Sequence, residues 1–176
     1  ETLARDRDLK EALVNSITLG VLSCGISAII GTLGAVGMAR VNYKRKGMME
    51  YLSTIPIMIP EIILGMVFLV FFSMLNLPFG MITLVIAHTT FCIPYIFMMV
   101  KARLVGIDKS LEEAARDLGA NAVKAFFTVT FKLTLPGLLT GVILTFIPSM
   151  GLFFIADILG GNKIVLVGSV IQDQLT

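Results

Sequence analysis

The sequence predicts an all-α fold, a polytopic bundle of transmembrane helices. Of its 176 residues, 56% are hydrophobic and only 15% are charged, whereas soluble domains carry about 25% charged residues. Two long runs, Ala12–Ala39 and Ile62–Val100, contain no Asp, Glu, Lys or Arg. About 20 apolar residues suffice for a helix to cross the roughly 30 Å hydrocarbon core. The net charge of +2 gives no reason to expect a nucleic-acid partner.

The first predicted span lies within Ala12–Ala39. Small residues recur there at every fourth position: Ser23, Ser27, Gly31, Ala35 and Ala39. Small residues at this spacing let two helix backbones approach closely. We expect this face to pack on another helix, either within the bundle or at a subunit interface.

Three further spans are expected, which gives four crossings in total. Ile62–Val100 is too long for one helix, and Asn76–Gly80 (NLPFG) supplies a turn that divides it. The predicted spans are 51–75, 81–100 and 133–155. After the last of them, ADILGGNK (156–163) breaks the pattern, and 164–171 is too short to cross. Prolines within the spans are expected to kink them, at Pro56, Pro60, Pro94 and Pro148.

Lysine and arginine set the predicted orientation. Ten of the fourteen lie in two segments, one after the first span (Arg40, Lys44, Arg45, Lys46) and one between the third and fourth (Lys101, Arg103, Lys109, Arg116, Lys124, Lys132). Basic residues collect on the cytoplasmic side. We therefore expect both segments to be cytoplasmic, and the N-terminal segment and residues 157–176 to lie outside.

The cytoplasmic loop 101–132 has the pattern of a short helix, a glycine turn and a second helix. Ser110 and Glu113 have the spacing of a capping box. Leu111, Ala114, Ala115 and Leu118 fall on one face. Gly119 stands where a helix ends in a left-handed conformation. Asn121 can cap the second helix, whose apolar residues are Val123, Phe126, Phe127 and Phe131.

Three functions fit this pattern equally well. The loop can be a solvated connector, or its helices can lie on lipid headgroups. It can also insert a helix into a groove of a cytoplasmic partner.

The segment EEAARDLGA (Glu112–Ala120) resembles the EAA signature of permease subunits in ATP-binding-cassette (ABC) importers. In that signature a glutamate, two alanines, three residues and a glycine open a pair of coupling helices, and Glu113, Ala114, Ala115 and Gly119 match. The family fold is the type I importer permease fold with six spans, of which this chain is expected to hold about four. The sequence is therefore interpreted as a single permease domain, 1–176, that is a piece of a longer protein.

One position departs from the family pattern. Where the signature continues to a proline, the register gives Lys132, and the next Leu-Pro pair is Leu135–Pro136. We expect Lys132 to extend the second coupling helix or to change how the chain enters the fourth span.

Three longer segments resemble spermidine/putrescine importers. Residues 51–72 and 91–120 are similar to one permease subunit of these importers, and residues 133–163 to the partner subunit. The resemblance implies a polyamine permease in the bacterial cytoplasmic membrane. Its partners would be an ATP-binding subunit, a second permease subunit, an extracytoplasmic polyamine-binding protein and the lipid bilayer.

The coupling residues implied by the resemblance are Glu113, Ala114, Ala115, Gly119 and Phe126. The sequence contains no G-x-x-x-x-G-K-[ST] loop, so we expect ATP hydrolysis on another chain, no enzyme activity here and no cofactor.

Ionisable residues within spans are candidate transport-path residues, because burying them unpaired is costly. Glu61, near the middle of the second span, would suit a polycationic substrate, or would bond a neighbouring helix or free backbone N–H groups. Asp157 would face incoming polyamine or the binding protein, or cap the turn. His88 is expected to be a neutral, hydrogen-bonded core residue. Cys24 and Cys92 lie in apolar runs, where buried thiols are expected and neither a disulfide nor a metal site.

Other functions remain as alternatives. A permease for another small solute would carry the same signature, and an uncoupled channel or scaffold would not need the ATPase. An intramembrane enzyme is disfavoured by the single histidine and by the lack of H-E-x-x-H and G-x-S-x-G.

Overall fold

The computed structural model describes residues 2–40, 44–161 and 164–175, and every regular element in these ranges is helical. The elements, in order, are α1 (Thr2–Arg40), α2 (Lys46–Met58), α3 (Glu61–Met74), α4 (Met81–Val105), α5 (Ser110–Asp117), α6 (Ala122–Ala125), the π-helical η1 (Phe126–Thr130), α7 (Phe131–Gly151), α8 (Phe153–Leu159) and α9 (Val167–Leu175). The predicted all-α fold is confirmed.

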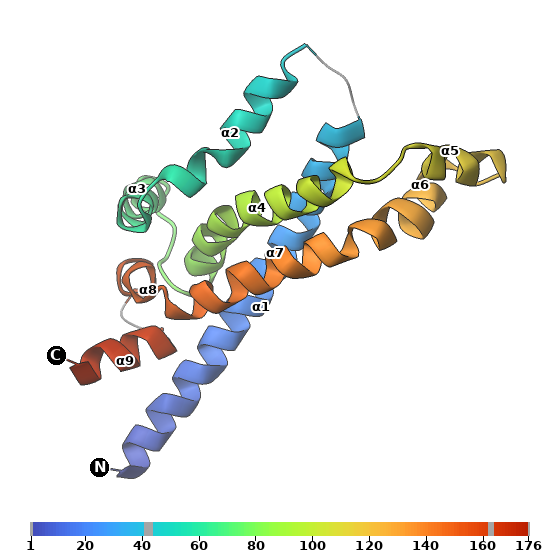
Figure 1. Cartoon of the computed structure of the whole chain (residues 1–176). Helices are drawn as coiled ribbons and strands as arrows, with labels where there is room; N and C mark the ends of the chain where they lie inside the picture. Colours follow the sequence, from blue (N-terminus) through green and yellow to red (C-terminus); the bar gives the residue numbers. More distant parts are fainter. Residues whose placement is uncertain (1, 41–43, 162–163, 176) are drawn as a thin grey trace.

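Helices α1, α4 and α7 form the central bundle (Figure 1). Its core has two hydrophobic clusters. One, at the α5 end, comprises Ala35, Ile96, Phe97, Val100, Leu104 and Leu138. The other, toward α3 and α8, comprises Leu19, Phe72, Leu84, Ala87, Ile155, Ala156, Leu159 and Leu166.

The stripe of small residues on α1 packs on α4 within this chain. The Ser27 hydroxyl donates to the carbonyl oxygen of Thr89 (3.0 Å). A Cβ atom on Gly31 would lie 3.2 Å from the Ile93 carbonyl oxygen. The small side chains therefore let the two backbones approach, which confirms the bundle interpretation of the stripe.

The second predicted span is not a straight helix. Among the described residues, three helices are long and apolar enough to cross a membrane: Leu9–Arg40, Met81–Val105 and Ala122–Gly151. Helices α2 and α3 pass the same test only as a pair, bent by 101°. Ile59 is extended (ψ 126°) before Pro60, as expected because a proline ring disfavours helical geometry in the residue before it. Four crossings result when the bent pair counts as one span.

Glu61, predicted near the middle of the second span, is the first residue of α3 and lies directly after the bend of the α2–α3 pair. The predicted fourth span also differs, because α7 ends at Gly151 and residues 153–159 form the separate helix α8. Residues 162 and 163, at the end of the predicted break 156–163, lie outside the described residues.

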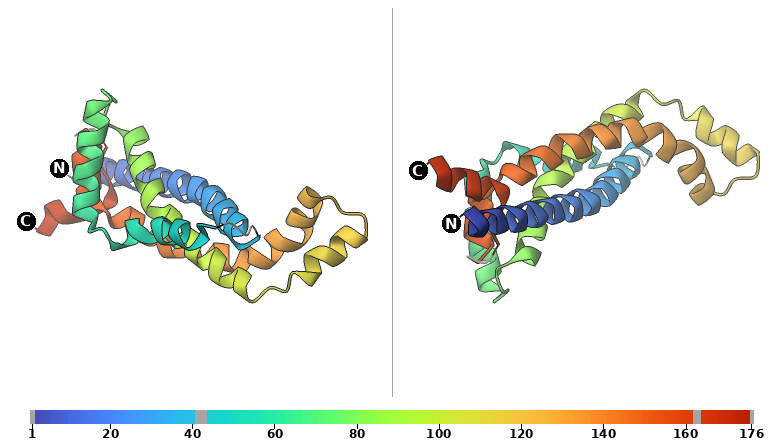
Figure 2. Two further views of the ribbon diagram at one scale, coloured as in Figure 1. Left: turned by 90° about the horizontal axis from the view of Figure 1, so that it is seen from above. Right: turned by 90° about the horizontal axis from the view of Figure 1, so that it is seen from below.

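Helices α5 and α6 form an arm that projects beyond one end of the bundle (Figures 1 and 2). Both chain termini, α3 and α8 lie toward the opposite end. The arm places residues 110–125 at one extremity of the molecule, at the ends of α4 and α7.

The predicted turn between the helices of the arm is confirmed. Gly119 has φ +86°, a conformation that favours glycine. Its N–H donates to the Arg116 carbonyl (2.9 Å), and the Ala120 N–H donates to the Ala115 carbonyl (3.0 Å). These two bonds form a Schellman motif, which satisfies carbonyls at the end of α5.

The second helix of the arm is continuous with a span. Asn121 caps it as predicted, since its Oδ1 accepts from the Lys124 N–H (2.8 Å). α6, η1 and α7 then follow without a break, and Lys132 lies in the first turn of α7. The second helix of the arm therefore continues into the span through Lys132, the position of the family proline, in agreement with one of the two outcomes predicted for it.

Candidate functional site: the coupling arm

Helix α5 begins with a cap that the sequence interpretation did not anticipate. Lys109 and not Ser110 holds the N-cap position, and the Glu113 N–H donates to the Lys109 carbonyl oxygen (3.1 Å), so the predicted Ser110–Glu113 capping box is wrong. Asp108 Oδ1 instead accepts from the Ser110 N–H (2.9 Å). This bond holds the pKa of the Asp108 carboxyl below its usual value, so its stabilising effect is present at neutral pH and is lost as the pH falls through that lowered pKa.

The apolar side of the arm is exposed. Leu111 is 48% exposed, Leu118 is 90% exposed and Val123 on α6 is 65% exposed. Ala114 is also exposed, whereas Ala115 is half-buried. Water-exposed apolar groups at this density are unfavourable for an isolated helix but suit a surface that a partner covers.

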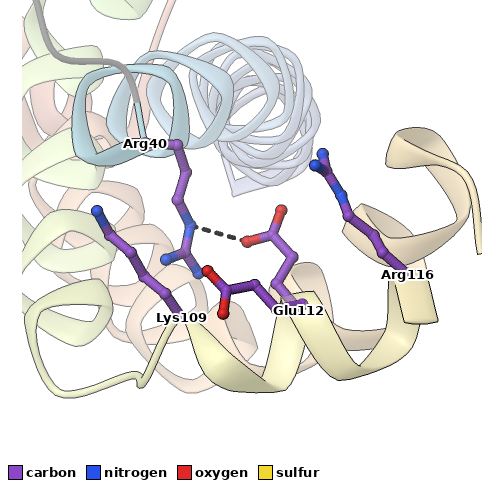
Figure 3. A pocket seen from close by; sticks show the side chains of 5 residues that line it. Arg40, Lys109, Glu112 and Arg116 are labelled. Atoms are coloured by element: carbon purple, nitrogen blue, oxygen red, sulfur yellow. Dashed lines mark ion pairs between the residues drawn. The ribbon is translucent and has the colours of Figure 1, made fainter. Parts of the chain in front are cut away.

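The polar side of α5 meets the end of α1. Arg40, the last residue of α1, places its Nε 2.9 Å from Glu112 Oε2, and the two side chains are only 18% and 20% exposed. Figure 3 shows the Arg40 side chain extending toward α5, with Lys109 and Arg116 on either side of the pair in this view. With Glu113, these residues line a cavity of about 190 Å³.

The predicted coupling residues do not share one environment. Glu113 is exposed at the rim of the charged cavity. Phe126 begins η1 and is half-buried, with its ring centroid 5.0 Å from that of Phe127 and 6.2 Å from that of Phe131. These rings line an apolar groove with α1 and α7, so Phe126 sits at the base of the arm and not at its exposed tip.

Arg40 and Glu112 were not among the predicted site residues. The sequence identifies Arg40 only as an orientation signal and Glu112 only as the first residue of the segment that resembles the EAA signature. One signal in the sequence could have indicated the pair. Both residues are predicted to be cytoplasmic, so the end of the first span and the loop are expected on the same side of the membrane.

The candidate transport-path residues are not brought together. The Glu61 carboxylate makes no ion pair or hydrogen bond with any described residue. Asp157 is exposed on α8 and its Oδ1 accepts from the Ser169 hydroxyl on α9 (3.1 Å). The structure thus gives Asp157 a local partner and leaves Glu61 without one.

Some buried polar atoms of the bundle have hydrogen-bond partners, whereas others, among them His88 Nε2 and the hydroxyls of Ser23 and Thr32, have none among the described residues. His88 is fully buried and its Nδ1 lies 2.9 Å from the Leu84 carbonyl oxygen of its own helix, as expected for a hydrogen-bonded core residue. Cys24 and Cys92 are buried free thiols, as predicted. No group of histidine, cysteine and acidic residues suited to a metal ion occurs in the described part of the chain.

Comparison with known proteins places the chain among transport permeases. It is 32% identical over 166 residues to the putrescine transport system permease protein PotI of Escherichia coli K12, covering 90% of this chain and 59% of PotI. It is 29% identical over 161 residues to the spermidine/putrescine permease PotC of Haemophilus influenzae, covering 92% and 63%. With PotB of the same organism the identity is 30% over 177 residues, covering 91% and 62%. The chain thus spans about three-fifths of the length of these relatives.

A solved structure of the MetNI methionine ABC transporter, in inward-facing conformations, shares the fold. Its TM-score is 0.69 at 22% identity, and the match covers 95% of this chain and 78% of that one. This likeness confirms the predicted permease architecture.

The model of one protein family, the binding-protein-dependent transport system inner membrane component, matches residues 17–174. This range includes most of the first candidate span, the whole of the other two and the whole arm. The chain therefore belongs to the family of binding-protein-dependent transport system inner membrane components.

Proposed function

We propose that this chain is part of the transmembrane subunit of an ATP-driven importer that moves polyamine, spermidine or putrescine, across the bacterial cytoplasmic membrane. The family match and the polyamine permeases among its relatives support this function. The observation that carries it is the coupling arm, α5 and α6, whose amphipathic helix α5 presents an exposed apolar side beyond the ends of the spans.

The arm would act as a lever between an ATPase and the bundle. In this proposal α5 seats in a groove of a cytoplasmic ATP-binding subunit, the helix-in-groove mode of recognition. Leu111, Ala114 and Leu118 supply the apolar contact, and Glu113 lies beside them at the charged rim. Since α6 continues into α7, a displacement of the arm reaches a membrane span without an intervening flexible segment.

The remaining partners follow from the same proposal. A second permease subunit would complete the pathway, and an extracytoplasmic polyamine-binding protein would deliver the substrate to the end of the molecule opposite the arm. ATP would be hydrolysed by the cytoplasmic subunit.

Site-specific crosslinking tests the assignment. A photoreactive residue at Leu118, 90% exposed on the arm, should capture the ATP-binding subunit in membranes that contain the whole importer. The matched control is Ile82, 74% exposed near the other end of α4, which should capture none. Crosslinks from Leu118 to lipid alone would overturn the proposed coupling role.

Glu61 is proposed to contact the polycationic substrate, because its carboxylate is half-buried beside the α2–α3 bend and has no described partner. Glu61→Gln should lower uptake of labelled putrescine roughly tenfold or more, since a hydrogen bond to a charged group contributes on the order of 1.5–3 kcal/mol. Assembly with the ATPase should be unchanged. Glu61→Asp keeps the charge and should retain more uptake than Glu61→Gln. Equal uptake by Glu61→Gln and the parent protein would make Glu61 a structural residue.

A further inference from the structure

Helix α5 is joined to the rest of the molecule by two chain connections, by packing on η1 and α6, and by an ion pair to α1. The chain connects α5 to α4 through residues 106–109 and to α6 through residues 118–121. Each connection contains a glycine at a turn, Gly106 and Gly119. The Arg40–Glu112 ion pair is the attachment that joins α5 to α1 (Figure 3).

The ion pair is largely shielded from water, although the Arg40 Nε–H makes no hydrogen bond to any described residue. Both side chains are about four-fifths buried and the Nε–Oε2 distance is 2.9 Å, so water screens the charges less than at an open surface. Arginine stays charged at every physiological pH. The pair also matches both helix dipoles, because Arg40 lies in the last turn of α1 and Glu112 in the first turn of α5.

Two other cationic side chains lie close to Glu112 along the same segment of the chain. Lys109 and Arg116 stand at i−3 and i+4 and line the same cavity, and these spacings permit ion pairs along a helix. Glu112 nevertheless pairs with Arg40 of another helix. Arg40 is the last residue of α1, a helix that packs along α4 and α7. The pair therefore connects α5 to the central bundle.

We propose that Arg40 and Glu112 are positioning residues that hold α5 in its docking orientation and transmit its displacement to α1. The inference rests on the proposed coupling function. Without the pair, α5 would be held by its two turns and by its packing on η1 and α6, none of which joins it to α1, so it could move without moving the first span. With it, a partner that displaces α5 also displaces the end of α1.

Charge reversal and charge exchange test this link in the complete importer reconstituted in liposomes. The readout is the amount of labelled putrescine taken up per ATP hydrolysed, together with co-purification of the ATPase. Arg40→Glu and Glu112→Arg should each lower this ratio roughly 2- to 30-fold, the range for substitutions that disturb coupling between distant sites.

The double variant Arg40→Glu/Glu112→Arg should recover part of the ratio, because the pair is restored with both charges opposed to the helix dipoles. Lys109→Gln removes a cation from the same cavity without breaking the pair, and should leave the ratio at the parent value. A purely structural role for Arg40 would change the yield of the complex but not the ratio.

Each outcome decides the proposal. A parent ratio in both single variants overturns it, as does a double variant no better than either single one. If the single variants do not assemble, recovery of assembly by the double variant supports the link and its failure refutes it. A parent importer without ATP-dependent uptake would instead refute the proposed function itself.

Discussion

Gly137→Val is expected to remove most of the folded protein from the membrane. A Cβ atom on Gly137 would lie 2.8 Å from the Met99 carbonyl oxygen and 2.9 Å from Arg103 Cβ. Neither atom can move aside by a side-chain rotation, so α7 would have to separate from α4 along their contact. Overpacking a well-packed site costs about 1–3 kcal/mol, and a clash with backbone should reach or exceed the upper end of that range.

Separating α4 from α7 would also disturb neighbouring contacts. Gly141, one turn further along α7, would bring a Cβ to 3.0 Å from Ile96 Cα, so the close approach extends over two glycines spaced four residues apart. Arg103 Nε donates to the Leu133 carbonyl (3.2 Å) at the same contact. The loss should therefore affect the α4–α7 pair as a unit.

The control is the same substitution at an open site. Gly25 lies in α1, and a Cβ built there has no atom within 4 Å. Gly25→Val should give a yield and a thermal midpoint in detergent close to those of the parent chain, measured by size-exclusion chromatography after heating. A Gly137→Val protein as abundant and as thermally stable as the Gly25→Val control would show that the α4–α7 contact tolerates separation.

The sequence predicts the close contact made by α1 but not the one between α4 and α7. The stripe on α1 spans five positions at a constant spacing, and that regularity identified the packed face. Gly137 and Gly141 offer only two positions in an apolar segment, and nothing local names Met99 and Ile96 as their neighbours. Which helix lies against which is a tertiary property, decided by the fit of whole surfaces.

The bend at Pro60 illustrates the same limit. Pro56, Pro94 and Pro148 all remain inside helices, whereas Pro60 separates two helices at 101°. The local chemistry of the four prolines is identical, because each lacks an N–H and restricts the preceding residue. Neighbouring helices decide whether the freed carbonyls are satisfied in a kinked helix or the helix ends.

The coupling arm was predictable where its chemistry is local. Gly119 and Asn121 act on groups within a few residues, and both have the predicted roles. The prediction for the start of α5 was wrong because Asp108, and not Glu113, accepts from the Ser110 N–H. The two carboxylates are equally plausible local acceptors for that group. The Arg40–Glu112 pair joins distant parts of the chain, so no local pattern could reveal it.

Gly119→Val is expected to uncouple transport while the spans remain inserted. At φ +86° a β-branched side chain is strained, which costs about 1–3 kcal/mol. No atom lies within 4 Å of a Cβ built on Gly119, so the penalty is conformational and falls on the turn and not on the bundle. The native turn would lose population roughly 5- to 150-fold against alternatives, and with it the Schellman bonds that fix α5 relative to α6.

Two substitutions at this position separate conformation from size. Asparagine tolerates positive φ far better than valine, so Gly119→Asn should retain much of the binding-protein-stimulated ATPase activity and putrescine uptake that Gly119→Val loses. Both variants should be recovered from membranes in parent amounts, because the site is open on all sides. If Gly119→Val kept full stimulated ATPase activity in reconstituted importers, the left-handed turn would not be needed to present α5, and the lever proposed for the arm would have to act through α6 alone.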